Sequence, residues 1–329
     1  MRRPRRWALG VLAIIGVALI VLPLAFGMFT RAPQGADMIA GFRPYMTSAR
    51  LDGYQREIRQ IDAGVHDANT SAAAALAPTS GHASASFARR FPDVVDFGTQ
   101  WAPIDRSMTN MLTTIQANVG NYNAVAALPN FSLFPWFFVI PGAVLLILVG
   151  IAVVRPTWWT AVRWALVVLG VGLVLAPVAF QMFTRAPAGE YMVNAFRTIE
   201  TRSNVQSIQS DFGTIAGGEG AIQLELVPAL HAAGFTDTQI ATRFPGITAL
   251  EHNWVGILND LTPMIGAMSD NVGNYQAVAA LPPFPLFPWF FLLPGLLIGG
   301  LAFAAAPRRR AALPAPLPVP NRQFSEGGS

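Results

Sequence analysis

The residues best suited to polar chemistry occur twice in this chain, in the same order. The pentapeptide Asn-Val-Gly-Asn-Tyr occupies residues 118–122 and again residues 271–275, and an Arg-Phe-Pro triplet begins at Arg90 and again at Arg243. Amide and phenol groups form hydrogen bonds with polar ligands, and guanidinium groups bind anions. The candidate partner-binding residues are therefore Asn121, Tyr122, Asn274, Tyr275, Arg90 and Arg243.

The same residues also have a structural explanation. Tyr122 and Tyr275 each continue a stripe of apolar residues at helical spacing, which begins at Trp101 in one copy and at Trp254 in the other. Such a stripe is typical of a buried helix face. We favour packing as the role of the Asn-Tyr motif and a solvated helix end as the role of both arginines.

No motif indicates catalysis or cofactor binding. The chain has no cysteine, and its histidines match no zinc-ligand spacing: His66, His82, His231 and His252. The sequence also contains no Gly-x-Ser-x-Gly elbow, no phosphate-binding glycine loop and no HExxH helix. We predict no catalytic residue, no cofactor and no metal, and we favour a solvated helix end over a metal site at His66-Asp67.

Four long apolar segments account for the composition of the chain. It is 53% hydrophobic and only 12% charged, with a mean hydropathy of +0.42. A soluble domain carries about twice that charge. Each segment is near or above the roughly 20 residues that a helix needs to cross a membrane. The predicted transmembrane helices cover residues 7–30, 131–154, 164–184 and 286–306.

The first apolar segment also has features of a cleaved signal peptide. Residues 1–6 are basic, and residues 25–27 form a weak small-x-small cleavage site. The repeat argues against cleavage, because the sequence from Arg6 recurs from Arg163, in the middle of the chain. The cleavage-like triplet is lost in that second copy. We therefore expect an uncleaved anchor.

The apolar segments belong to a tandem repeat. Residues 28–33 recur as residues 182–187, and residues 133–138 recur as residues 286–291. The repeat unit is a membrane helix, a polar segment and a second membrane helix. The second helix of each unit begins with a Phe- and Trp-rich run, which we expect to form an interfacial aromatic belt. A Pro-Gly pair follows and is expected to kink the helix.

The polar segments, residues 31–130 and 185–285, also have helical periodicity. Leu51, Tyr54 and Ile58 are spaced as one face of a helix, and no alternating pattern indicates a strand. We predict an all-α membrane protein with four transmembrane helices and two extracytoplasmic helical domains, from a tandem duplication. Each domain is expected to be a bundle of about 100 residues. Variable loops are expected near residues 72–78 and 217–220.

Arginine placement predicts the topology. The basic tail at residues 1–6, the loop at 155–163 and the Arg/Pro-rich tail at 307–329 hold ten arginines and one acid, whereas both long segments together are acidic. Short Arg-rich segments remain in the cytoplasm, so both termini are expected there. The absence of lysine, with abundant Ala, Gly and Pro, suggests a GC-rich bacterial genome. Together with the four spans, this leads us to expect a multi-pass protein of the bacterial inner membrane. The basic residues lie beside the predicted spans, where anionic lipid headgroups account for the basic pI of the chain. The lipid bilayer is therefore an expected partner, and nucleic acid is not.

The expected function is binding. We expect a non-enzymatic scaffold or accessory protein whose paired outward domains bind an envelope protein or lipid. A transporter or transport accessory subunit is the alternative, but none of the predicted spans contains an ionisable residue for an ion path. An enzyme is a third class without positive support. The sequence indicates no oligomeric state, and the tail prolines fit either a docking segment or a disordered end.

Overall fold

Every element in the described part of the chain is helical. The structure is a computed structural model that describes residues 6–77 and 83–305. The first half contains α1 (Arg6–Ala25), α2 (Met28–Phe42), α3 (Ser48–His66), the π-helical η1 (Asp67–Ala72), α4 (Ala73–Ala75), α5 (Ala83–Arg90), α6 (Pro92–Ala117), α7 (Val119–Ala126), the 3-10 turn η2 (Phe131–Leu133) and α8 (Trp136–Val154). The second half contains η3 (Pro156–Trp158), α9 (Trp159–Ala179), α10 (Met182–Phe196), α11 (Arg202–Ala221), the π-helical η4 (Ile222–Leu226), α12 (Val227–Ala232), α13 (Asp237–Arg243), α14 (Pro245–Ala279), η5 (Phe284–Leu286) and α15 (Phe287–Ala304). The proline-rich tail and the arginines before Arg6 lie outside the described residues.

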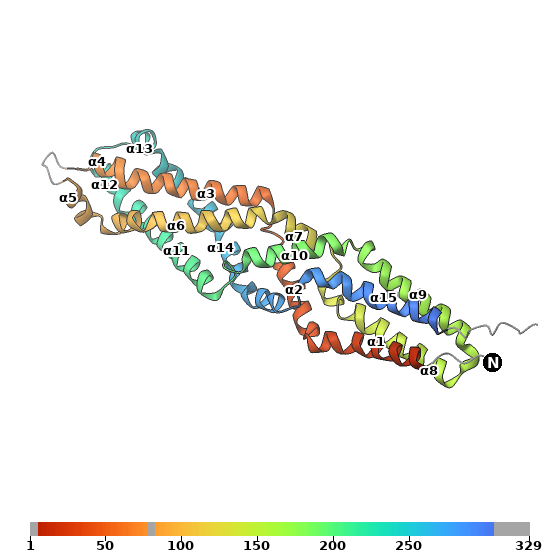
Figure 1. Ribbon diagram of the computed structural model, residues 1–329. Coiled ribbons are helices and arrows are strands. Elements are labelled where there is room, and N and C mark those ends of the chain that lie inside the picture. Colours follow the sequence, from red (N-terminus) through yellow and green to blue (C-terminus); the bar gives the residue numbers. More distant parts are fainter. Residues whose placement is uncertain (1–5, 78–82, 306–329) are drawn as a thin grey trace, which may run out of the picture.

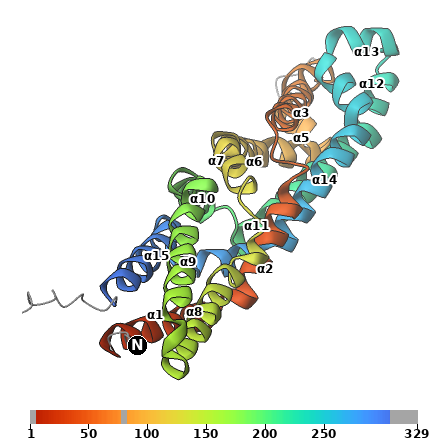
Figure 2. The same cartoon turned by 90° about the vertical axis from the view of Figure 1, so that its right-hand side faces the viewer.

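The helices form a long rod with four candidate membrane spans at one end. These spans are Arg6–Ala25, Phe131–Val154, Pro156–Ala179 and Phe284–Ala304. Figure 1 shows α1, α8, α9 and α15 at this end and α4, α5 and α13 at the other. In the view of Figure 2, α12 and α13 again lie far from α1 and α8. The third span begins inside the predicted loop 155–163, which is therefore shorter than expected.

The first and third spans also end earlier than the apolar runs predict. They stop at Ala25 and Ala179, whereas the predicted segments continue to residues 30 and 184. The chain turns just beyond each end through a left-handed residue, Gly27 at φ 61° and Gln181 at φ 54°. A new helix starts after each turn. Because the residues on both sides of the turn are apolar, hydropathy alone does not reveal the break.

The two spans within each repeat pack through glycine. A Cβ atom added to Gly142 of α8 would lie 2.9 Å from the carbonyl oxygen of Gly16 in α1. A Cβ on Gly295 of α15 would lie 2.8 Å from the carbonyl oxygen of Gly170 in α9. Such distances are too short for real side chains, so only glycine lets these backbones meet. The glycine of each Pro-Gly pair therefore serves close helix packing.

The two repeats meet through phenylalanines that pair with their own counterparts. Ring centroids lie 6.4 Å apart for Phe131 and Phe284, 6.0 Å for Phe134 and Phe287, and 4.6 Å for Phe138 and Phe291. Contacts between equivalent residues are expected at a two-fold axis. The three pairs therefore define an approximate two-fold relation between the repeats.

These pairs correct the expected aromatic belt. Phe134, Phe138 and their counterparts are buried in the core, because they cover one another across the repeats. Trp136 and Trp289, in contrast, have exposed fractions of 49% and 47%. The tryptophans of each run are thus placed as interfacial side chains would be, at the bundle end of the spans, and Phe137 and Phe290 are half-buried.

A second reciprocal contact joins the repeats just beyond the spans. Arg31 in the first turn of α2 donates from Nη1 to the carbonyl oxygen of Ala280, at the end of α14, over 2.8 Å. Arg185 in α10 donates from Nη1 to the carbonyl oxygen of Ala127, at the end of α7, also over 2.8 Å. Helix C-termini carry unpaired carbonyls and partial negative charge. Each repeat therefore caps a helix of the other.

Farther from the spans, the helices of the two repeats interleave in one bundle. α3 packs against α14, and α11 packs against α6. A Cβ on Gly64 would lie 2.7 Å from Leu250 Cδ2, and a Cβ on Gly218 would lie 2.1 Å from Phe97 Cγ. The two bundles expected from the sequence are thus a single one, because each repeat covers the apolar stripe of the other.

The segment expected as a variable loop at residues 217–220 is helical, whereas the one near residues 72–78 is helical only as far as Ala75 and leaves the helix in a turn at Leu76 and Ala77. Residues 72–75 belong to η1 and α4, and residues 217–220 lie within α11. The close approach to Phe97 explains why a small residue is needed at Gly218. The Arg-Phe-Pro triplets mark turns: α5 ends at Arg90 and α6 begins at Pro92, with the same arrangement between α13 and α14.

We predict opposite effects for two adjacent glycine substitutions in α11. Gly218→Ala should lower the free energy of unfolding by about 1–3 kcal/mol, because the new methyl group overlaps Phe97. Gly217→Ala should raise it by about 0.5–1 kcal/mol, because alanine favours a helix and a Cβ there meets nothing within 4 Å. Thermal unfolding of purified protein in detergent measures both. Equal effects would contradict the contact between α11 and α6.

Candidate functional site

Tyr122 and Tyr275 are buried and donate hydrogen bonds inside the protein. The hydroxyl of Tyr122 donates to the carbonyl oxygen of Ile39 over 2.5 Å, and that of Tyr275 donates to the carbonyl oxygen of Val193 over 2.7 Å. Burial raises the pKa of both phenols, so both remain protonated donors. Each tyrosine fixes α2 or α10 to the end of a core helix, and its hydroxyl is thereby occupied.

The asparagines of the same motif form hydrogen bonds with each other. Asn121 donates from Nδ2 to Asn118 Oδ1 over 2.9 Å, and Asn274 donates from Nδ2 to Asn271 Oδ1 over 3.0 Å. Asn118 and Asn271 are themselves buried. The motif therefore stabilises the region where α2 and α10 meet the core, and it presents little free polar surface.

Arg90 and Arg243 lie far from the Asn-Tyr motifs, at the end of the rod remote from the spans. They end α5 and α13, and both are exposed. The guanidinium of Arg90 lies 5.1 Å from the ring centroid of Phe91, and that of Arg243 lies 5.2 Å from the ring centroid of Phe235. The six candidate residues thus form two separate groups, of which only the arginines face the surroundings.

Asp67 has a structural partner. Its Oδ2 accepts a hydrogen bond from the backbone N–H of Gly246 over 2.6 Å, which satisfies an unpaired donor in the first turn of α14. The neighbouring His66 is exposed. Within residues 6–77 and 83–305, no group of three or more His, Asp or Glu side chains is placed to hold a metal ion.

A cluster of ionisable side chains, which sequence analysis missed, lies between α3 and α14. Arg50 Nη1 lies 3.0 Å from Asp260 Oδ1 in a partly exposed ion pair. Burial, and then a hydrogen bond and charge repulsion from Asp260, raise the pKa of Glu57 to about 7. Tyr54, which lies between Arg50 and Glu57 in the sequence of α3, is fully buried, and burial raises its pKa to about 12. Glu57 therefore gains a proton near neutral pH.

Glu200 lies at a small cavity where the two repeats meet. Its exposed fraction is 4%, and the cavity has a volume of about 20 Å³, lined by residues that include Phe42, Phe196 and Met268. Burial raises the pKa of Glu200 to about 8. Its Oε2 has no hydrogen-bond partner in the described part of the chain. The cavity is large enough for about one water molecule.

Glu219 in α11 is a second buried acid. Burial, and then the charge of Glu251, raise its pKa to about 7. Glu200 and Glu219 occupy the positions that Met46 and Val65 hold in the first repeat, and both of these are buried. Alignment of the two repeats could therefore have found these acids, because a carboxyl stands where the other copy has a buried apolar side chain.

Burial raises the pKa of Glu57, Glu200 and Glu219 and so favours their protonated forms. Among these three acids, Glu200 lines the small cavity between the repeats. The volume of that cavity, about 20 Å³, leaves no space for an organic substrate. Comparison of the chain with known protein families, curated proteins and solved structures finds no match. The interpretation of the site therefore depends on its own geometry.

We predict that the bundle loses stability as pH rises from about 5 to about 9. The folded protein holds protons on Glu57, Glu200 and Glu219 that the unfolded chain releases near pH 4.5. The folded state therefore binds more protons in this range, and the free energy of unfolding falls with pH. Thermal unfolding at several pH values measures this slope.

Substitution of Glu200 tests the origin of that slope. Glu200→Gln keeps the shape of the protonated side chain and removes its titration. We expect it to stabilise the protein at pH 9 by on the order of 3 kcal/mol and to change stability little at pH 5. Glu225→Gln, on η4 and exposed, is the control that should leave the slope unchanged. An unchanged slope in Glu200→Gln would contradict the prediction.

Proposed function

We propose that the chain is a non-enzymatic scaffold of the bacterial inner membrane, whose outward bundle binds an envelope partner or lipid. In this proposal the repeats come from a tandem duplication, both termini are cytoplasmic, and the bundle extends away from the bilayer. The binding surface is proposed to lie at the far end of the rod, around α5 and α13. The exposed Arg90 and Arg243 belong to this surface.

The observation that carries the proposal is the reciprocal joining of the repeats. Arg31 and Arg185 each cap a helix of the other repeat, and α3 and α11 each pack on a core helix of the other repeat. Relative motion of the repeats would break these contacts. A rod built in this way holds its far end at a fixed distance from the spans, as a scaffold requires.

The alternative, a transporter or transport accessory subunit, has less support. The ionisable residues within the candidate spans are Arg6, the first residue of its span, and Arg163, the eighth of the 24 residues of Pro156–Ala179, so neither lies at the middle of a span. The span contacts described above involve glycine backbones and phenylalanine rings. Transporters generally have polar or broken helices at a binding site near the midplane. This difference favours binding over transport.

The proposed orientation predicts which sites a membrane-impermeant thiol reagent can reach. The chain has no cysteine, so a single introduced cysteine reports one position. Leu224→Cys in the bundle should react in intact cells, because Leu224 is 78% exposed. Thr157→Cys, between α8 and α9, should react only after the cells are opened. The reverse pattern would contradict the topology.

We also predict that Arg90 and Arg243 contribute to partner capture. The double substitution Arg90→Gln and Arg243→Gln should lower the yield of crosslinked envelope partner by about fivefold or more, because a surface charge contributes about 1 kcal/mol. Photo-crosslinking in intact cells followed by mass spectrometry measures the yield. Arg106→Gln, exposed on α6, is the matched control.

Two outcomes would contradict the scaffold proposal. Equal yields from the double variant and from Arg106→Gln would exclude the distal arginines from the binding surface. Transport of an ion or solute by the purified protein in liposomes would favour the alternative function instead.

A further inference from the structure

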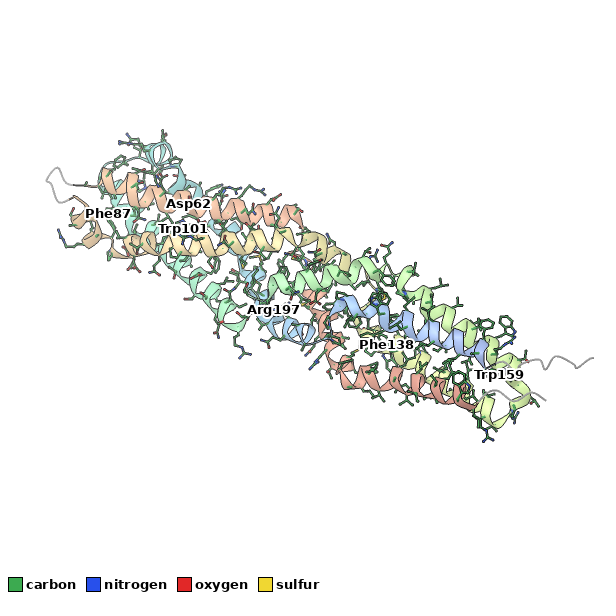
Figure 3. The ribbon with its side chains drawn as sticks, viewed as in Figure 1. Asp62, Phe87, Trp101, Phe138, Trp159 and Arg197 are labelled. Atoms are coloured by element: carbon green, nitrogen blue, oxygen red, sulfur yellow. The ribbon has the colours of Figure 1, made fainter. Side chains whose placement is uncertain are left out.

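An apolar cavity opens between α1 and α15, at the end of the spans nearest the bundle. Figure 3 places Phe138, one of its lining residues, at the level where the spans meet the bundle. The cavity volume is about 220 Å³, larger than the roughly 150 Å³ engineered cavity that binds benzene. Its lining residues are all apolar, and they include Ala18, Leu22, Phe26, Trp289, Phe290 and Leu293. We call this cavity the α1–α15 groove.

The groove is open on the outer side of the spans. Leu22, Trp289 and Leu293 line it and are 42%, 47% and 53% exposed. These side chains belong to helices that are long and apolar enough to cross a membrane. In a bilayer the open side therefore faces hydrocarbon, and an acyl chain is the molecule that can enter it.

A guanidinium lies at the bundle end of the groove. Arg31 Nη1 donates to the carbonyl oxygens of Phe26, over 3.1 Å, and of Ala280, over 2.8 Å, and Phe26 lines the groove. These bonds orient the side chain. Its Nε and Nη2 have no hydrogen-bond partner among the residues that the structure describes. A guanidinium has five N–H donors in a planar fork that matches a phosphate group.

The counterpart position between α8 and α9 is different. By the repeat, Phe26 corresponds to Phe180 and Phe290 corresponds to Phe137. The rings of Phe137 and Phe180 contact each other with centroids 6.0 Å apart, whereas Phe26 and Phe290 line the cavity. The helices α8 and α9 are consecutive and joined by the short turn η3, whereas α1 and α15 have no such link.

We propose that the α1–α15 groove binds one acyl chain of an anionic phospholipid, whose phosphate is held by Nε and Nη2 of Arg31. The position of the groove in the spans supplies the acyl chain, and the oriented guanidinium supplies the charge complement to the headgroup. The site does not depend on the distal binding surface, so either proposal can fail without the other.

Tryptophan fluorescence can measure this binding in full-length protein. The protein is reconstituted in phosphatidylcholine with increasing amounts of phosphatidylglycerol brominated on its acyl chains, which quenches nearby tryptophans. The signal of Trp289 is the fluorescence of the unsubstituted protein minus that of the Trp289→Phe variant. The signal of its repeat counterpart, Trp136, is obtained in the same way with the Trp136→Phe variant. The two indoles have nearly equal exposure, so contact with bulk lipid is matched.

Preferential binding lowers the brominated fraction needed for half-quenching. We expect this fraction to be about tenfold lower for Trp289 than for Trp136, which corresponds to about 1.4 kcal/mol. Arg31→Gln should raise the brominated fraction that half-quenches Trp289 about fivefold, because a surface charge contributes about 1 kcal/mol. Arg185→Gln should leave that fraction unchanged. Ala18→Phe fills the groove and leaves Arg31 in place. In this variant the quenching curve of Trp289 should coincide with that of Trp136.

Three results would overturn the proposal. Coincident curves for Trp289 and Trp136 in the unsubstituted background would mean that the groove binds no lipid preferentially. Equal quenching of Trp289 by brominated phosphatidylcholine and phosphatidylglycerol would remove the headgroup role of Arg31. An equal effect of Arg31→Gln and Arg185→Gln would show that the arginines act on the fold; the thermal unfolding midpoint of each variant then reports that loss directly.

Discussion

The structure depends on the pairing of each repeat with the other. At the level of the spans, Phe138 meets its counterpart Phe291 at 4.6 Å, and just beyond the spans Arg31 and Arg185 exchange caps. In the bundle, Gly64 and Gly218 admit Leu250 and Phe97 of the opposite repeat. A single repeat would leave all these surfaces uncovered, so the repeats must fold as one body.

The elements of the fold were more predictable from the sequence than their assembly. The four apolar helices were predictable because uninterrupted hydrophobicity of that length is typical of helices that cross a membrane. Their ends were not, because Gly27 and Gln181 turn the chain within apolar surroundings. The interleaving of α3 with α14 was also hidden, because a hydrophobic stripe predicts a buried face and says nothing about which helix covers it.

The candidate site was less predictable for a similar reason. Tyr122 and Tyr275 were chosen as polar groups, but each hydroxyl is occupied by a carbonyl more than eighty residues away in sequence. Arg90 and Arg243 remain exposed at the far end, and their role in binding stays a prediction. The buried acids were overlooked because carboxyl groups are normally on the surface, and only the apolar residue at the equivalent position reveals their burial.

The second repeat departs from the first at two buried positions, where it has an acid in place of an apolar residue. Glu200 and Glu219 stand where the first repeat has Met46 and Val65, and burial disfavours the ionised form of both acids. They lie within the interleaved bundle, whereas the span contacts described here join glycine backbones and phenylalanine rings. Loss of a proton would leave a charge between packed helices of the bundle, and that cost is what keeps both acids in their protonated form to a higher pH than a solvated carboxyl.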